Sequence, residues 1–97
     1  MEQSTYIFIE EFCTHYNIDA SLVYQLVDFE VLSIEKTDEK EVISVAELPK
    51  LEKMVRLHQE LEINPQGLQA IHHLLEQITH LQEEVLSLRR KLNRFEN

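Results

Sequence analysis

Three histidines are the residues whose types and spacing come nearest to a metal site. His72, His73 and His80 fall within one stretch of nine residues, and on a helix His73 and His80 would lie two turns apart on one face. A zinc site needs three or four ligands that converge on the ion, so a neighbouring molecule would have to complete the set. Solvent-exposed histidines are the commoner case, and the sequence predicts neither a metal nor another cofactor.

Catalytic chemistry has little support elsewhere in the chain. Cys13 is the only cysteine, so no intrachain disulfide can form, and no neighbouring Lys or Arg in sequence would stabilise its thiolate. His58 stands close to Glu60 and Glu62, but this spacing matches no familiar arrangement of a nucleophile and a base. The single glycine leaves no phosphate-binding loop. We therefore expect a protein that is not an enzyme.

Charge is unevenly distributed along the chain. Residues 1–47 hold eleven acidic and two basic residues, while residues 48–97 hold seven of each, so the net charge of −9 comes from the first part. A protein that reads DNA normally gains affinity from Lys and Arg that neutralise phosphates. The sequence therefore favours a protein partner over DNA. Residues 1–35 contain no Lys or Arg and seven carboxylates, namely Glu2, Glu10, Glu11, Asp19, Asp28, Glu30 and Glu35.

The pattern of apolar residues predicts two short helices joined by a tight turn. A short strand at residues 5–8 precedes the first helix, whose apolar positions are Ile9, Phe12, Cys13 and Tyr16. Asn17 can adopt the left-handed conformation that ends this helix, and Asp19 suits the N-cap of the second. We expect Tyr24 and Phe29 to be partly buried. The apolar face of the second helix consists of Leu22, Val23, Leu26, Val27 and Phe29.

Two β-prone runs follow the helix-turn-helix. Residues 31–34 and 42–45 are rich in Val and Ile and flank a charged loop at residues 35–41, which predicts a small hairpin, the wing. Ser44 and Glu47 have the spacing of a capping box, and a third helix should run from there to about Glu62. Pro49 disturbs its first turn because proline has no backbone N–H.

The C-terminal third predicts one long helix. Asn64 is a suitable N-cap and Pro65 a suitable first helical residue. Leu68 and Leu75 widen the apolar stripe near its start, where we expect burial within the chain. Beyond Leu81 the stripe should narrow to strict a and d positions. Apolar residues fill these positions over four heptads, namely Ile71, Leu74, Ile78, Leu81, Val85, Leu88, Leu92 and Phe95.

This heptad pattern predicts a coiled-coil homodimer. In a parallel pair Glu84 would face Arg89 of the partner, and Lys91 would face Glu96, and both contacts are attractive. An antiparallel pair and a fold-back against the third helix remain open. We expect the dimer seam to consist of Ile78, Leu81, Val85, Leu88, Leu92 and Phe95.

Taken in order, these elements resemble the MerR-type winged-helix architecture across nearly the whole chain. The predicted fold class is mainly α: a MerR-like winged helix-turn-helix with a small β-hairpin wing and a long C-terminal coiled-coil helix. We expect residues 1–62 to form the winged helix-turn-helix body and residues 63–97 the dimerisation helix. No secretory signal or membrane span is recognisable, so we expect a cytoplasmic protein.

A closer resemblance is to the CbpM chaperone-modulator family. Residues 11–13 match that family's Glu-Phe-Cys segment, and His15 and Ile18 follow it. Residues 55–67 are similar to its Arg-Leu, Glu-Leu, Asn and Gly pattern. The residues that carry this second similarity are Val55, Arg56, Leu57, Glu60, Leu61, Ile63, Asn64 and Gly67. The second helix lacks the Arg and paired Tyr residues with which MerR-type activators typically reach DNA.

The resemblance implies inhibition of a DnaJ-like, CbpA-type co-chaperone. Such a modulator binds the J-domain and blocks its productive engagement of Hsp70. J-domains of that kind present a basic helix, which an acidic surface would attract. The expected contact residues are Glu10, Glu11, Asp19, Tyr24, Asp28 and Glu30. The alternative is a MerR-type DNA-binding transcriptional regulator, whose phosphate contacts would come from Lys36, Lys40, Lys50, Lys53 and Arg56.

Overall fold

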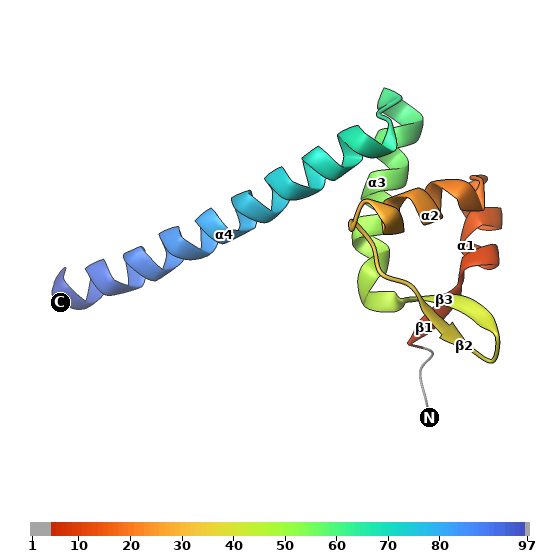
Figure 1. Ribbon diagram of the computed structural model, residues 1–97. Helices are drawn as coiled ribbons and strands as arrows, with labels where there is room; N and C mark the ends of the chain where they lie inside the picture. The colour runs from red at the N-terminus through yellow and green to blue at the C-terminus, as the bar shows by residue number, and fades with distance from the viewer. Residues whose placement is uncertain (1–4, 97) are drawn as a thin grey trace.

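The chain folds into a small winged helix-turn-helix body from which one long helix projects (Figure 1). The computed structural model describes residues 5–96, without the side chain of Glu96. The predicted fold class, a mainly α winged helix-turn-helix with a long C-terminal helix, is confirmed. The elements in chain order are β1 (Tyr6–Phe8), α1 (Ile9–Tyr16), α2 (Ala20–Asp28), β2 (Glu35–Thr37), β3 (Lys40–Ser44), the 3₁₀ turn η1 (Val45–Glu47), α3 (Leu48–Leu61) and α4 (Pro65–Glu96).

Helices α1 and α2 end in the same way. Asn17 and Glu30 both adopt the left-handed conformation, with φ of 55° and 61°. The next backbone N–H then reaches back to the helix, so Ile18 donates to the carbonyl of Cys13 at 3.0 Å and Val31 to that of Leu26 at 2.9 Å. Such ends satisfy carbonyls that would otherwise lack partners. The predicted role of Asn17 is confirmed.

The predicted N-cap of α2 is only partly right. Asp19 has the extended conformation of an N-cap residue, but its side chain makes no capping hydrogen bond. Its carbonyl accepts the N–H of Leu22 at 3.1 Å, so the backbone alone starts the helix.

The first strand of the wing lies later in the chain than predicted. Residues 31–34 form no strand, because Val31 closes the end of α2 and both Val31 and Leu32 are buried in the core. The strand is instead β2, within the predicted loop, and it pairs with β3 from Glu35 opposite Val42 to Thr37 opposite Lys40. β3 also pairs with β1, which gives a three-stranded antiparallel sheet of order β1-β3-β2.

The turn of the wing is strained, which leads to a stability prediction. Asp38 and Glu39 join the two strands with φ of 51° and 66°, a conformation that favours glycine. We expect Glu39→Gly to raise the free energy of unfolding by about 0.5–1 kcal/mol, measured by urea denaturation. Ala70→Gly, at an exposed position within α4, is the control and should lower it by about 1 kcal/mol. A destabilised Glu39→Gly protein would contradict this turn geometry.

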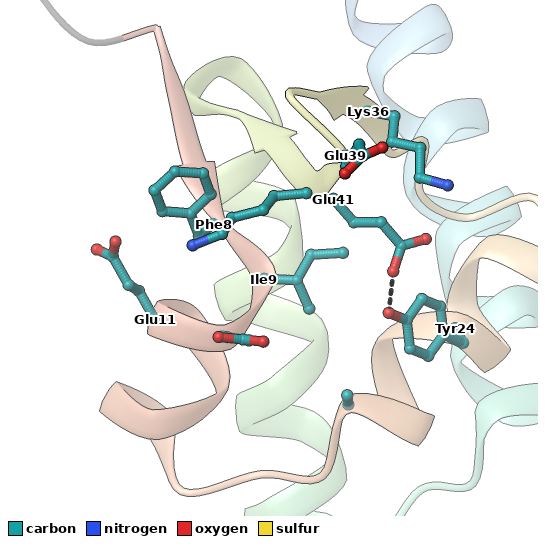
Figure 2. A pocket seen from close by; sticks show the side chains of 10 residues that line it. Phe8, Ile9, Glu11, Tyr24, Lys36, Glu39 and Glu41 are labelled. Atoms are coloured by element: carbon teal, nitrogen blue, oxygen red, sulfur yellow. Dashed lines mark hydrogen bonds between the residues drawn. The ribbon is translucent and has the colours of Figure 1, made fainter.

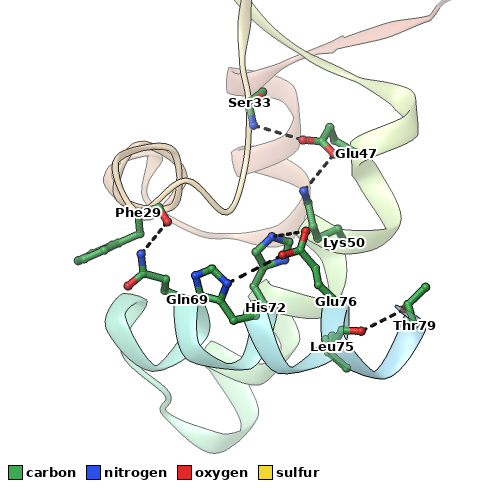
Figure 3. Close-up of polar contacts among 10 residues, drawn as sticks. Phe29, Ser33, Glu47, Lys50, Gln69, His72, Leu75, Glu76 and Thr79 are labelled. Carbon is green, nitrogen blue, oxygen red and sulfur yellow. Dashed lines mark hydrogen bonds and ion pairs between the residues drawn. The ribbon is translucent and has the colours of Figure 1, made fainter. Parts of the chain in front are cut away.

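The predicted capping box at the start of α3 is wrong. The hydroxyl of Ser44 accepts the N–H of Ala46 and so caps the 3₁₀ turn. Glu47 does not complete the box. Its carboxylate accepts the N–H of Ser33 at 3.2 Å and pairs with Lys50 at 3.2 Å (Figure 3), so it fastens the segment before the wing to the start of α3.

The first part of α4 is held against the body. Asn64 caps the helix as predicted, since its side-chain oxygen accepts the N–H of Gly67 at 2.7 Å. A Cβ at Gly67 would lie 2.7 Å from the side chain of Ile63, which explains the glycine. Leu68 is fully buried, and Gln69 donates to the carbonyl of Phe29 at 3.0 Å (Figure 3).

One hydrophobic core holds the body together. It collects side chains from both short helices, from α3, from the sheet and from the start of α4. Side chains of this size contribute roughly 1.5–3 kcal/mol each when they leave water. The largest fully buried ones are Phe12, Leu26, Ile43, Leu51, Met54 and Leu68. Within residues 5–96 no helix has the length and apolarity to cross a membrane.

Candidate protein-binding surfaces

A cleft of about 610 Å³ separates the beginning of α1 and α2 from the wing. β1 leads directly into α1 at Ile9, which places Glu10 and Glu11 in the first turn of α1, where the helix dipole favours negative charge. Tyr24 faces the cleft from α2, and Glu39 and Glu41 face it from the wing (Figure 2). The remaining lining residues are Phe8, Ile9, Ala20, Lys36 and Lys40.

Two contacts link the walls of this cleft. The hydroxyl of Tyr24 donates a hydrogen bond to the carboxylate of Glu41 (Figure 2), which joins α2 to the wing. The ammonium group of Lys40 lies 5.2 Å from the ring centre of Phe8, which is within the range of a cation–π contact. Tyr24 is 38% exposed and Phe8 39% exposed, so both rings are exposed and the expected partial burial of Tyr24 is wrong. Phe29 is half-buried against the core.

The hydrogen bond between Tyr24 and Glu41 predicts that the stability of the folded protein decreases at high pH. The hydrogen bond to Glu41, with desolvation as a lesser cause, raises the pKa of Tyr24 above its usual value of 10. A group whose pKa is raised on folding stabilises the fold below the unfolded pKa and loses this contribution as pH rises through the folded pKa. We expect Glu41→Gln to lower the pKa of Tyr24, measured by ultraviolet titration against Tyr24→Phe. Glu39→Gln is the control, and an equal shift there would contradict the assignment.

The structure does not bring all six predicted contact residues together. Glu10, Glu11 and Tyr24 line the cleft. Asp19 instead borders a second hollow, with His58 and other residues at the end of α3. Asp28 and Glu30 lie at the opposite end of α2 from Ala20. All five carboxylates are exposed.

The sequence alone did not predict that residues of β1 and the wing line this cleft. Phe8, Glu39, Lys40 and Glu41 belong to it because β1 pairs with β3, a contact between segments more than thirty residues apart in sequence. No local pattern reveals such a pairing. The alternation of aromatic and aliphatic residues at Tyr6–Phe8 indicates a strand but not its neighbour.

A second candidate surface runs along the projecting part of α4. Leu75 and Ile71 still pack against the core, as expected near the start of the helix. The six predicted seam residues are exposed, at 49% for Ile78, 57% for Leu81, 45% for Val85, 62% for Leu88, 58% for Leu92 and 90% for Phe95. All six are at least 45% exposed in the single chain, and the part of α4 that carries them projects away from the body (Figure 1).

The exposed stripe is wider than the strict a and d pattern. Leu86 occupies a b position and is 50% exposed. With Ile78, Leu81 and Val85 it lines a shallow, almost wholly apolar hollow of about 480 Å³. The expectation that only a and d positions are apolar beyond Leu81 is therefore wrong.

The histidines pair with carboxylates along α4. His72 and His73 lie 3.5 Å and 3.9 Å from the carboxylate of Glu76, and His80 lies 3.5 Å from that of Glu84. Among residues 5–96 no three His, Cys, Asp or Glu side chains are placed to hold a metal ion together. His58 contacts the carbonyl of Ile63 at 2.8 Å, at the junction of α3 and α4.

The side chain of Cys13 is buried, which predicts that its thiol reacts slowly. Its side chain is buried in α1, and this burial, with a smaller effect of Asp19, raises the pKa of the thiol. Because the thiolate is the reactive form, we expect a thiol reagent at pH 8 to react at least about tenfold more slowly with the folded protein than with the urea-unfolded chain. Equal rates would contradict the burial of Cys13.

Comparison with known protein families assigns the chain to one of them. The family model for MerR HTH family regulatory proteins matches residues 7–90, from β1 to the second half of α4. No individual curated protein matches the chain. The matched region covers both candidate surfaces except the last seam residues. Because the match extends over most of the sequence and agrees with the observed elements, the chain belongs to the MerR HTH family of regulatory proteins.

Proposed function

We propose that this MerR-family protein regulates a protein partner rather than DNA, as a dimeric modulator of a CbpA-type co-chaperone. The protein would bind the J-domain of the co-chaperone and block its productive engagement of Hsp70. Support for the specific partner comes from the resemblance of residues 11–67 to the CbpM family. Support for the class of partner comes from the surface charge.

The acidity of the helix-turn-helix and the wing is the observation that carries the proposal. Residues 5–44 contain nine carboxylates and only two lysines. Eight of the nine carboxylates are exposed, and Glu41 is half-buried. In a DNA-binding relative these are the elements that approach the duplex. Here they would be repelled by phosphates and attracted to a basic protein surface.

The five basic residues of the body lie in two places, two in the acidic cleft and three on α3. Lys36 and Lys40 line the cleft beside four carboxylates. Lys50 is paired with Glu47, and Arg56 lies 4.0 Å from Glu60. Lys53 borders a groove between α3 and α4. DNA binding, the second candidate, is favoured by membership of the MerR family but by no contact in this molecule.

Dimerisation is the second part of the proposal. Exposed large apolar side chains in a row mark interaction sites, and α4 carries such a row at heptad spacing over residues 78–95. Burial against an identical helix would remove these side chains from water. Both copies would then present their acidic bodies on one shared coiled coil.

An Hsp70 ATPase assay tests the proposed activity. We expect the protein to reduce the ATPase stimulation caused by the CbpA-type co-chaperone of the same organism, because a covered J-domain cannot reach Hsp70. The basal ATPase activity of Hsp70 alone is the control and should not change. Undiminished stimulation at a large excess of the protein would contradict the proposal.

A further inference from the structure

The ring of Phe8 is an exposed aromatic surface that already binds a cation. Phe8 is the last residue of β1 and is 39% exposed, whereas the next residue, Ile9, is buried in the core. The ammonium group of Lys40, from β3, lies over this ring at 5.2 Å from its centre. A contact of this kind on an exposed ring is weak enough to be exchanged for another cation.

The surroundings of this ring favour a positively charged ligand. Glu10, Glu11, Glu39 and Glu41 line the same cleft, against Lys36 and Lys40. Glu41 accepts the hydrogen bond of Tyr24. Within residues 5–96 the structure gives the side chains of Glu10, Glu11 and Glu39 no hydrogen bond or ion pair. Three carboxylates that line the same cleft as this ring are therefore available to a cationic side chain.

The shape of the cleft suits a helix rather than a small ion. Its volume of about 610 Å³ is bounded on one side by α1 and α2 and on the other by the wing. The exposed rings of Phe8 and Tyr24, together with Ala20, provide apolar surface beside the charged groups, whereas Ile9 is buried. A basic amphipathic helix combines Lys or Arg side chains with apolar ones, and it can match both features at once.

We propose that this cleft docks a basic helix of the partner protein, and that a Lys or Arg of that helix replaces Lys40 over the ring of Phe8. The inference rests on the proposed function, because it places the J-domain contact on one face of the body. Lys40 then acts as an internal competitor: it occupies the cation position in the free protein and must leave when the partner binds.

Two lysine variants distinguish displacement of Lys40 from Phe8 from a general change in the charge of the cleft. Lys40→Gln and Lys36→Gln remove the same charge from the same cleft, but only Lys40 contacts Phe8. We expect Lys36→Gln to tighten binding of the isolated J-domain slightly. Lys40→Gln should tighten it about two- to fivefold further, since the cation–π contact no longer competes. Calorimetry measures both, and circular dichroism checks that each variant is folded.

A double-mutant cycle tests whether Phe8 is the shared site. Phe8→Leu keeps an apolar side chain but removes the ring, and it should weaken J-domain binding. In the Phe8→Leu background Lys40→Gln should lose its advantage over Lys36→Gln, because the ring that both cations need is absent. Equal effects of the two lysine variants in the wild-type background would overturn the inference.

A second probe distinguishes failure of the docking site from failure of the proposed function. A dye-labelled basic amphipathic helical peptide is titrated into the same full-length variants and followed by fluorescence anisotropy. If the J-domain does not bind but the peptide shows the Lys40→Gln advantage, the cleft is a basic-helix site and the proposed partner is wrong. If neither ligand shows it, the cleft inference is wrong. Binding of random duplex that both lysine substitutions weaken would also overturn it, because the ligand would be anionic.

Discussion

Replacing Leu81 and Leu88 by Asp should convert the proposed dimer into a monomer at micromolar concentrations. Both leucines are more than half exposed in the single chain, and in the proposed coiled coil they would occupy adjacent d positions. Burial of an unpaired carboxylate costs several kcal/mol, and each dimer would contain four such groups. Analytical ultracentrifugation of the wild-type and variant proteins measures the change directly.

Loss of the dimer should also unfold the C-terminal part of α4. From Ile78 onward the helix is exposed along its whole length, and an isolated helix of this size is marginal in water. We expect the helical signal at 222 nm to fall by up to about 30%, in proportion to the share of helical residues that lies beyond Gln77. Thermal unfolding of the body should change much less.

Substitutions on the outer face of α4 provide the control. Ser87→Asp and Asn93→Asp add the same charge at c and b positions of the heptads. These positions point away from the seam, so this variant should remain dimeric. A monomeric wild-type protein, or equal effects of the two pairs of substitutions, would contradict the coiled-coil seam.

Charge reversal at Glu10 and Glu11 should weaken J-domain binding by about 10- to 100-fold at low salt. The two carboxylates line the cleft and lie in the first turn of α1. Their replacement by Lys turns attraction of a basic helix into repulsion. It also places positive charge at the helix N-terminus, which costs about 0.3–1 kcal/mol of stability for each residue. Calorimetry measures the affinity, and urea denaturation shows that the variant is still folded.

A matched reversal elsewhere separates a local contact from net charge. Glu60→Lys with Glu83→Lys changes the net charge by the same amount, at exposed positions outside the cleft. We expect this control to reduce the affinity only slightly and mainly at low salt, where long-range attraction is strongest. Equal losses in the two variants would show that the cleft is not the binding site.

Helices with strong periodic patterns and clear ends were predictable from the sequence. Asn17 ends α1, and Asn64 with Pro65 starts α4, because these residues favour their backbone conformations locally. The predicted strand at residues 31–34 was wrong because Val31 and Leu32 pack in the core of the body instead. A run of β-prone residues does not reveal whether its side chains are needed elsewhere.

The candidate surfaces were predictable to different degrees. The α4 stripe follows from one repeat along one helix, so its exposed residues could be identified from spacing, apart from Leu86. The acidic cleft is assembled from β1, two helices and the wing. Its carboxylates on α1 were predicted from composition, while Phe8 and Lys40 depend on the pairing of β1 with β3. Tertiary contacts of this kind are absent from local sequence patterns.

Calorimetric titration of the full-length protein with the isolated J-domain of the same organism's CbpA-type co-chaperone, at low and moderate salt, tests the central claim most directly. We predict binding at micromolar affinity or tighter that weakens as salt increases, as expected for an acidic surface and a basic partner. No detectable heat at either salt concentration, with both proteins folded, would contradict the modulator proposal. Tight binding of DNA duplex under the same conditions would instead favour a DNA-binding regulator.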